Sequence, residues 1–154
     1  MGFIAPFTIR AKVVLQEMWT SGIYLDDSLN EIVVNKSREW FRKLEELCCL
    51  KIARCLQLDE DIISTTIHTF VDASQEAHGS VVYARHVNKN GLAFARLIAA
   101  KSRGAPLISV SIPRLELMAA VLGLWLALSV RQALELSEKH LVLRSDSMNV
   151  VHLG

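Results

Sequence analysis

The sequence predicts an α/β fold in which a mixed sheet of four strands follows a small helical segment. A β-branched run at Thr66–Ser74 has the alternation typical of a buried or half-buried strand. An Asn-Gly pair at residues 90–91 separates two further strand-like runs and is a strong hairpin signal. A long apolar segment then precedes a last short strand. We therefore predict three antiparallel strands, a crossover helix and a parallel fourth strand.

Composition limits the class of protein. The chain has 154 residues, of which 51% are hydrophobic and 21% charged. These values exclude a disordered chain and are enough for one domain, or for one small domain with an appendage. The net charge of +1 indicates no class of partner. The three cysteines, Cys48, Cys49 and Cys55, lack zinc-site spacing and favour reduced thiols in an intracellular protein.

The first 61 residues predict a helical segment. A helix is expected over Thr8–Trp19 with Thr8 as its N-cap, and a second is expected after a cap within residues 26–28. Residues 51–61 are interpreted as a connector. The domain boundaries predicted are thus 1–61 for the helical segment and 62–154 for the sheet domain.

The sheet domain is expected to continue with strands over Ser80–Val87 and Leu92–Ala100, followed by a loop over 101–111. Pro113 is expected to open a helix that ends near 134–136, because proline is favoured in the first turn. Its apolar run, Leu117–Val130, is shorter than the roughly 20 residues that cross a bilayer. We predict a helix buried on most sides and no membrane partner. The last strand is expected over His140–Asp146.

Three acidic residues stand in unusual places. Asp72 and Asp146 each end an apolar strand, where ligand sites of such sheets lie. Asp72 could instead cap the next turn. Glu116 shares a helix face with a stripe of small residues, which would let the helix approach the sheet and bring this carboxylate to the strand ends. The alternative is an exposed first-turn Glu favoured by the helix dipole.

Three carboxylates in one pocket would repel each other unless cations join them. Hard oxygen ligands without nearby cysteine or paired histidine favour Mg²⁺ or Mn²⁺. Two such ions about 3.5–4 Å apart can support phosphodiester cleavage.

The stretch between His78 and Leu115 contains no acidic residue. Its basic residues suit a nucleic-acid backbone, or else solvent-facing positions of an exposed sheet edge. The candidate nucleic-acid contacts are Arg85, Lys89, Lys101, Arg103 and Arg114.

The sequence also resembles the ribonuclease H region of Pao-type (BEL/Pao) retrotransposon polyproteins. The resemblance rests on Phe70–Ser74 with Gly79, on residues 99–107, on Ile112–Leu117 around Glu116, and on Leu143–Ser147. Residues 3–19, 26–27 and 52–56 are similar to the segment that joins the reverse transcriptase to its ribonuclease H, although Ala53 replaces a more usual proline.

The resemblance implies a ribonuclease H-like fold and hydrolysis of the RNA strand of an RNA–DNA hybrid. It implies that Asp72, Glu116 and Asp146 are the catalytic carboxylates and bind two Mg²⁺ or Mn²⁺ ions. The rest of a reverse transcriptase polyprotein is the implied partner. Because the family pattern continues with a fifth strand and a fourth carboxylate, we expect a C-terminally truncated fragment of impaired activity. The alternative is a non-catalytic relic or a module that binds nucleic acid or a partner.

Overall fold

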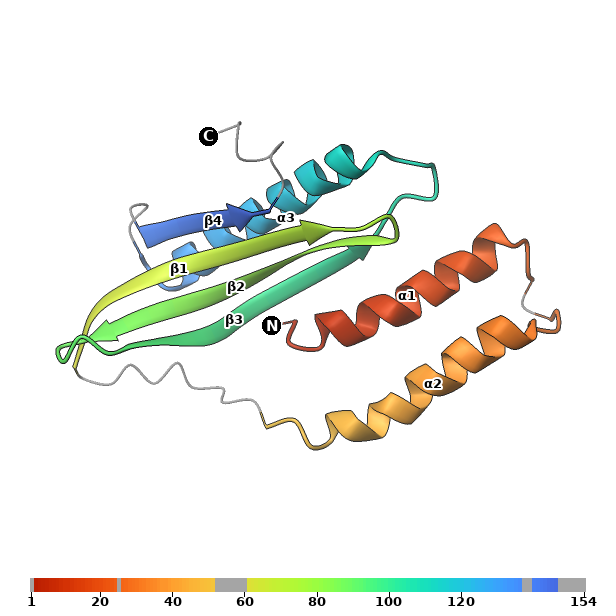
Figure 1. Ribbon diagram of the computed structural model, residues 1–154, viewed down its shortest axis with the longest axis horizontal. Coiled ribbons are helices and arrows are strands. Elements are labelled where there is room, and N and C mark those ends of the chain that lie inside the picture. The colour runs from red at the N-terminus through yellow and green to blue at the C-terminus, as the bar shows by residue number, and fades with distance from the viewer. Residues whose placement is uncertain (1, 25, 52–60, 137–139, 147–154) are drawn as a thin grey trace.

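The computed structural model describes residues 2–24, 26–51, 61–136 and 140–146. Two helices come first, α1 at Ala5–Thr20 and α2 at Glu31–Leu47. Three long strands follow, β1 at Ile62–Ala73, β2 at Ala77–Asn88 and β3 at Ala93–Gly104. The long helix α3 at Ile112–Ala133 then leads to the short strand β4 at Leu141–Ser145. Figure 1 shows α3 behind the sheet and α1 beside β3.

The four strands form one sheet in the order β3-β2-β1-β4. The first three are antiparallel neighbours, and β4 pairs in parallel with β1. The Asn-Gly turn joins β2 to β3, with Gly91 at a positive φ of 76° that glycine adopts readily. The predicted mixed α/β sheet and the parallel fourth strand are therefore confirmed.

The predicted first residues of both N-terminal helices were wrong. The first begins at Ala5, ahead of the predicted Thr8, and has proline in its first turn, where a missing N–H costs nothing. The second begins after Asn30 and not within residues 26–28, because the Asn30 side chain accepts a 2.8 Å hydrogen bond from the Val33 N–H. Ring stacking of Phe7 on Trp40, at 4.7 Å between centroids, holds the two helices together.

Helix α1 also contacts the sheet directly. Ser102 Oγ donates to the Ala5 carbonyl at 3.1 Å, and Gln16 Nε2 donates to the Ala105 carbonyl at 2.9 Å. The connector expected over 51–61 lies mostly outside the described residues, as does Cys55. The other two cysteines, Cys48 and Cys49, are free and exposed.

The strands are longer than predicted at several ends. Strand β1 begins four residues before Thr66, and β3 continues through Gly104. Lys101 and Arg103 are therefore strand residues and not part of a loop, since Ser80 and His78 of β2 pair with them. The strands are longer because the neighbouring strand β2 supplies backbone hydrogen-bond partners over its full length. A local sequence pattern does not reveal this pairing.

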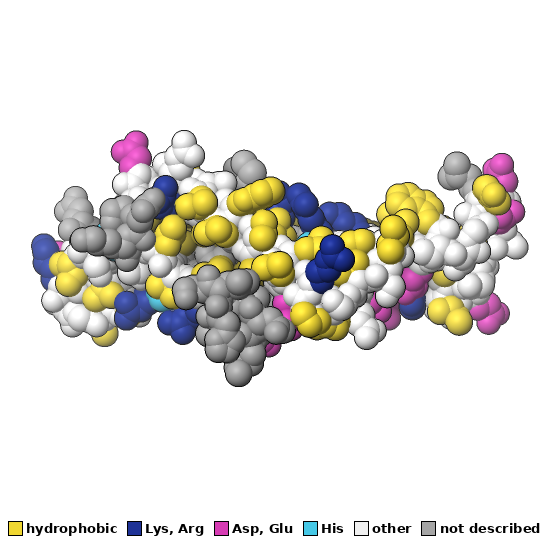
Figure 2. All heavy atoms as spheres, turned by 90° about the horizontal axis from the view of Figure 1, so that it is seen from above, with side chains coloured by type: hydrophobic (Ala, Val, Ile, Leu, Met, Phe, Trp, Pro, Cys, Tyr) yellow, Lys and Arg dark blue, Asp and Glu magenta, His cyan; other side chains and the backbone are white. Residues whose placement is uncertain are grey.

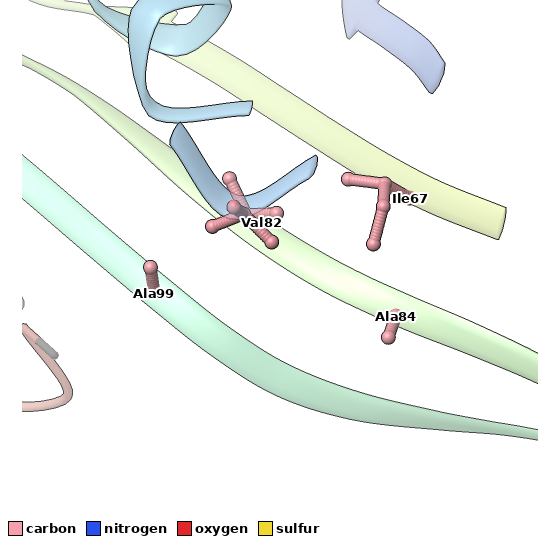
Figure 3. Close-up of a cluster of buried hydrophobic side chains, with 5 residues drawn as sticks. Ile67, Val82, Ala84 and Ala99 are labelled. Atoms are coloured by element: carbon pink, nitrogen blue, oxygen red, sulfur yellow. The ribbon is translucent and has the colours of Figure 1, made fainter. Parts of the chain in front are cut away.

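The core lies between the sheet and α3. Ile67, Val82, Ala84 and Ala99 project from the three long strands into one cluster, drawn in Figure 3, and Val130 of α3 completes it. The stripe of small residues on α3 faces the sheet as predicted: Ala119, Ala120, Gly123 and Ala127 are all buried. Gly123 sits so close to the sheet that an added Cβ would overlap Val71 Cγ1.

The outer side of α3 differs from the prediction of a helix buried on most sides. Five large apolar side chains there are exposed, including Trp125 at 62%. The view from above in Figure 2 shows hydrophobic side chains gathered in this region. A sheet covers only one side of a helix, so an all-apolar helix keeps an exposed face. By length and composition alone α3 could also cross a membrane, although its small-residue stripe packs on the sheet as in a core helix.

The close approach at Gly123 generates a stability prediction. Gly123→Ala adds up to about 1 kcal/mol of helix propensity. It also forces overlap with Val71, which costs about 1–3 kcal/mol in a packed core. We expect a lower urea midpoint for Gly123→Ala, and partial recovery when Val71→Ala makes room in the double variant. Equal effects of Gly123→Ala with and without Val71→Ala would contradict the contact.

Two buried histidines generate a pH prediction. Burial lowers the pKa of His78 and of His86 from 6.5, with the charges of Arg103 and Arg96, respectively, as a second cause. The unfolded chain therefore takes up protons first. The two histidines should not reduce the free energy of unfolding above about pH 6.5. Below that pH the free energy of unfolding should fall as the pH drops toward the lowered pKa values of the folded state.

Urea midpoints at about pH 8 and about pH 5.5 measure this loss. The double variant His78→Gln/His86→Gln should show a flatter pH dependence over that interval. An unchanged slope in the double variant would assign the loss to other groups.

Candidate functional site at the strand ends

The carboxyl ends of β1, β3 and β4 lie at one edge of the sheet. Strands β1 and β4 run in parallel, and β3 runs in the same direction because β2 is antiparallel to both of its neighbours. Figure 1 shows the three arrowheads pointing to the same side, where α3 also begins. This edge is termed the strand-end edge below. It is where the sequence predicts the three acidic residues Asp72, Glu116 and Asp146.

The register brings the two aspartates together. The last recorded parallel pair is Val71 with Ser145. One residue further along, Asp72 stands alongside Asp146, on strands that neighbour each other at about 4.8 Å. Both residues are exposed. Both aspartates are therefore open to solvent at the ends of neighbouring strands, where a shared ligand could reach them.

Asp72 does not organise the turn that follows it. Its Oδ1 accepts from the N–H of the next residue, Ala73, at 2.7 Å. The turn is held by Ser74, whose Oγ accepts from the Ala77 N–H at 3.2 Å and whose N–H donates to the Ala77 carbonyl at 2.8 Å. Ser74 therefore holds this turn, which argues against the alternative that Asp72 caps it.

Glu116 occupies the first turns of α3 and is half-buried. It lies seven residues before Gly123, which is about 10 Å along the helix axis and on the same helix face. Gly123 packs over Val71, near the end of β1. Glu116 is therefore on the sheet-facing side of α3, toward the strand-end edge and not on the outer apolar side.

The three acids share an edge, but they do not form a ready ligand set. Within residues 2–24, 26–51, 61–136 and 140–146, no group of three or more histidine, cysteine or acidic side chains is close enough to hold a metal ion. The structure thus places Asp72 and Asp146 one residue beyond the last β1–β4 pair and, among the described residues, shows no cluster that joins them with Glu116. The metal centre of three carboxylates stays a prediction.

The predicted basic residues separate into two groups. Lys101, Arg103 and Arg114 lie at the strand-end edge, on the last residues of β3 and the first turn of α3, and all are exposed. Arg85 and Lys89 lie toward the opposite end of β2, where Lys89 pairs with Asp61 at 2.9 Å. Only the first group is positioned near the aspartates.

One polar group at this edge was missed from sequence. His78 is 4% exposed, pairs with Arg103 across the strands, and its Nδ1 has no partner among the described atoms. Ser80 Oγ and Thr69 Oγ1 are likewise buried without a described partner under α3. The period-two spacing of His78, Ser80 and Val82 was the available signal, since alternate strand residues share a face.

Comparison with known families adds to this geometry. The family model described as "Pao retrotransposon-like RNaseH-like domain" matches residues 1–147, which spans both the helical segment and the sheet. The comparison with curated proteins found no match. The mixed sheet and the crossover helix α3 agree with an RNase H-like fold. The chain therefore belongs to the Pao retrotransposon-like RNaseH-like domain family.

Proposed function

We propose that this chain is a retrotransposon-derived hydrolase domain that cleaves the RNA strand of RNA–DNA hybrids with Mg²⁺ or Mn²⁺. The observation that carries the proposal is the β1–β4 register, whose last pair, Val71 with Ser145, directly precedes Asp72 and Asp146 at the carboxyl ends of parallel strands. This position is where open α/β sheets place their ligands. Family membership supports nucleic acid as the substrate class.

The donor chemistry fits hard divalent cations. Asp72 and Asp146 offer exposed carboxylate oxygens, which Mg²⁺ and Mn²⁺ prefer. These two residues would hold the ions, and Glu116 would join them as the third ligand. When bound, a pair of ions supplies an activated water and stabilises the leaving oxygen in phosphodiester cleavage.

The chain's own residues would position the substrate. Lys101, Arg103 and Arg114 are exposed at the strand-end edge, so they are available to contact phosphates close to the aspartates. Parallel pairing ends directly before both aspartates, which supports a site that must hold its ligands in one geometry. The second group, Arg85 and Lys89, would contact nucleic acid only outside this edge.

Cleavage of a labelled RNA–DNA hybrid in Mg²⁺ tests the proposal. Asp72→Asn keeps the shape of the side chain but removes a charged oxygen ligand, so we expect at least about a 100-fold loss of rate. Asp26→Asn is the matched control, because Asp26 is an exposed aspartate in the segment between α1 and α2. Its rate should equal that of the unchanged chain.

Equal cleavage by Asp72→Asn and the unchanged chain would end the catalytic assignment. Absence of cleavage in the unchanged chain, with folding confirmed by circular dichroism, would favour the non-catalytic alternative instead.

A further inference from the structure

A group of buried polar side chains lies between α3 and the sheet, close to the strand-end edge. Thr69, His78 and Ser80 are only 1%, 4% and 6% exposed, respectively. Among the described atoms, Thr69 Oγ1, His78 Nδ1 and Ser80 Oγ have no hydrogen-bond partner. These three residues are termed the polar row below. A buried polar atom without a partner costs free energy, so the polar row calls for a physical explanation.

The register places the polar row beside the candidate site. Asp72 pairs with Gly79 across β1 and β2, and the residues on either side of Gly79 are His78 and Ser80. Thr69 lies on the same strand as Asp72, three residues before it. The polar row therefore leads from the space under α3 to the end of β1 that carries Asp72.

Gly123 brings the backbone of α3 close to the polar row. A Cβ atom at this position would lie 3.1 Å from Ser80 Oγ and 3.3 Å from Thr69 Cγ2. Both side chains therefore lie against the main chain of α3, whose carbonyl oxygens have a second lone pair beyond their helical hydrogen bond. Serine and threonine hydroxyls can donate to such carbonyls. A small shift of α3 would give the two hydroxyls the partners that they lack.

The residues of α3 around the polar row allow such a shift. The helix meets the sheet here through the small residues Ala119, Ala120 and Gly123, all of which are buried. Small side chains interlock less deeply than large ones, and short sliding movements of packed helices are a known kind of conformational change. Glu116 precedes Ala119 by about one helical turn. Sliding of α3 along its axis would therefore move the Glu116 carboxylate relative to the strand-end edge.

We propose that the polar row couples the position of α3 to cation binding, with Thr69 and Ser80 as positioning residues for Glu116. In the described arrangement both hydroxyls are unpartnered, and no cluster of described residues joins Glu116 with Asp72 and Asp146. When Glu116 joins the two aspartates at a divalent cation, α3 moves with it and its carbonyls accept hydrogen bonds from the two hydroxyls. These hydrogen bonds then add to the affinity for the ion. The choice of a cation as the ligand rests on the proposed function.

Removal of one hydroxyl tests this coupling by two measurements that need no cleavage. Thr69→Val replaces an unpartnered hydroxyl with a methyl group of similar shape, so the urea midpoint in EDTA should rise. The same variant cannot form the hydrogen bond that accompanies cation binding. Its affinity for Mn²⁺, measured by calorimetry, should therefore fall about 3-fold to 10-fold.

Two matched variants serve as controls. Thr69→Ser keeps the hydroxyl and loses the methyl group beside Gly123, so it should lower the urea midpoint yet bind Mn²⁺ within about 2-fold of the unchanged chain. Thr65 lies on the same strand and face, and its Oγ1 already has a partner, His86 Nδ1, at 2.9 Å. Thr65→Val should therefore lower the urea midpoint and leave the Mn²⁺ affinity unchanged.

Ser80→Ala should repeat the result of Thr69→Val at the second hydroxyl. Unchanged Mn²⁺ affinity in both variants would overturn the proposal and leave the proposed function standing. A lower urea midpoint in EDTA for both variants would also overturn it, because the hydroxyls would then be hydrogen-bonded before any cation binds. Absence of Mn²⁺ binding by the unchanged chain would remove the proposed cation site itself, and the positioning role with it.

Discussion

The parallel pairing of β1 with β4 is the constraint on which the rest of the structure depends. Its five residue pairs, from Ile67 with Leu141 to Val71 with Ser145, fix which residues stand side by side at the strand ends. Because side chains alternate along a strand, a slip of one residue would move Asp146 to the other face of the sheet. The candidate metal site therefore depends on this register.

Helix α3 makes this pairing sterically feasible. A parallel connection needs a crossover, and this crossover lies close to the sheet because its inward residues are alanine and glycine. The close packing leaves Glu116 on the sheet-facing side, toward the same edge as the aspartates. It also buries Thr69, His78 and Ser80 under the helix without described partners for one polar atom in each. Three buried polar atoms thus lie near the candidate site, and each carries a desolvation cost that no described hydrogen bond offsets.

The fold could largely be predicted from the sequence because its signals are local: the Asn-Gly turn, the β-branched strand and the proline at the start of α3. The strand-end error arose because a distant neighbour decides the outcome, since β2 extends β3 through Lys101 and Arg103. The start of α2 was wrong for a local reason, because the side chain of Asn30, and not one within residues 26–28, caps the helix. For the site, the approach of Asp72 to Asp146 followed from topology. The position of Thr69 and Ser80 together under α3 depends on the inter-strand register, which one sequence does not reveal.

Paramagnetic line broadening by Mn²⁺ in the amide spectrum of the chain tests the central claim most directly. If the register sets a cation site at the strand-end edge, broadening should centre on the amides of Ala73 and Asp146. It should weaken with distance, reaching the first turn of α3 near Glu116. Broadening centred on the opposite end of the sheet, around Asp61 and Lys89, would contradict the account. So would a spectrum that Mn²⁺ leaves unchanged, because the paired aspartates would then hold no ion.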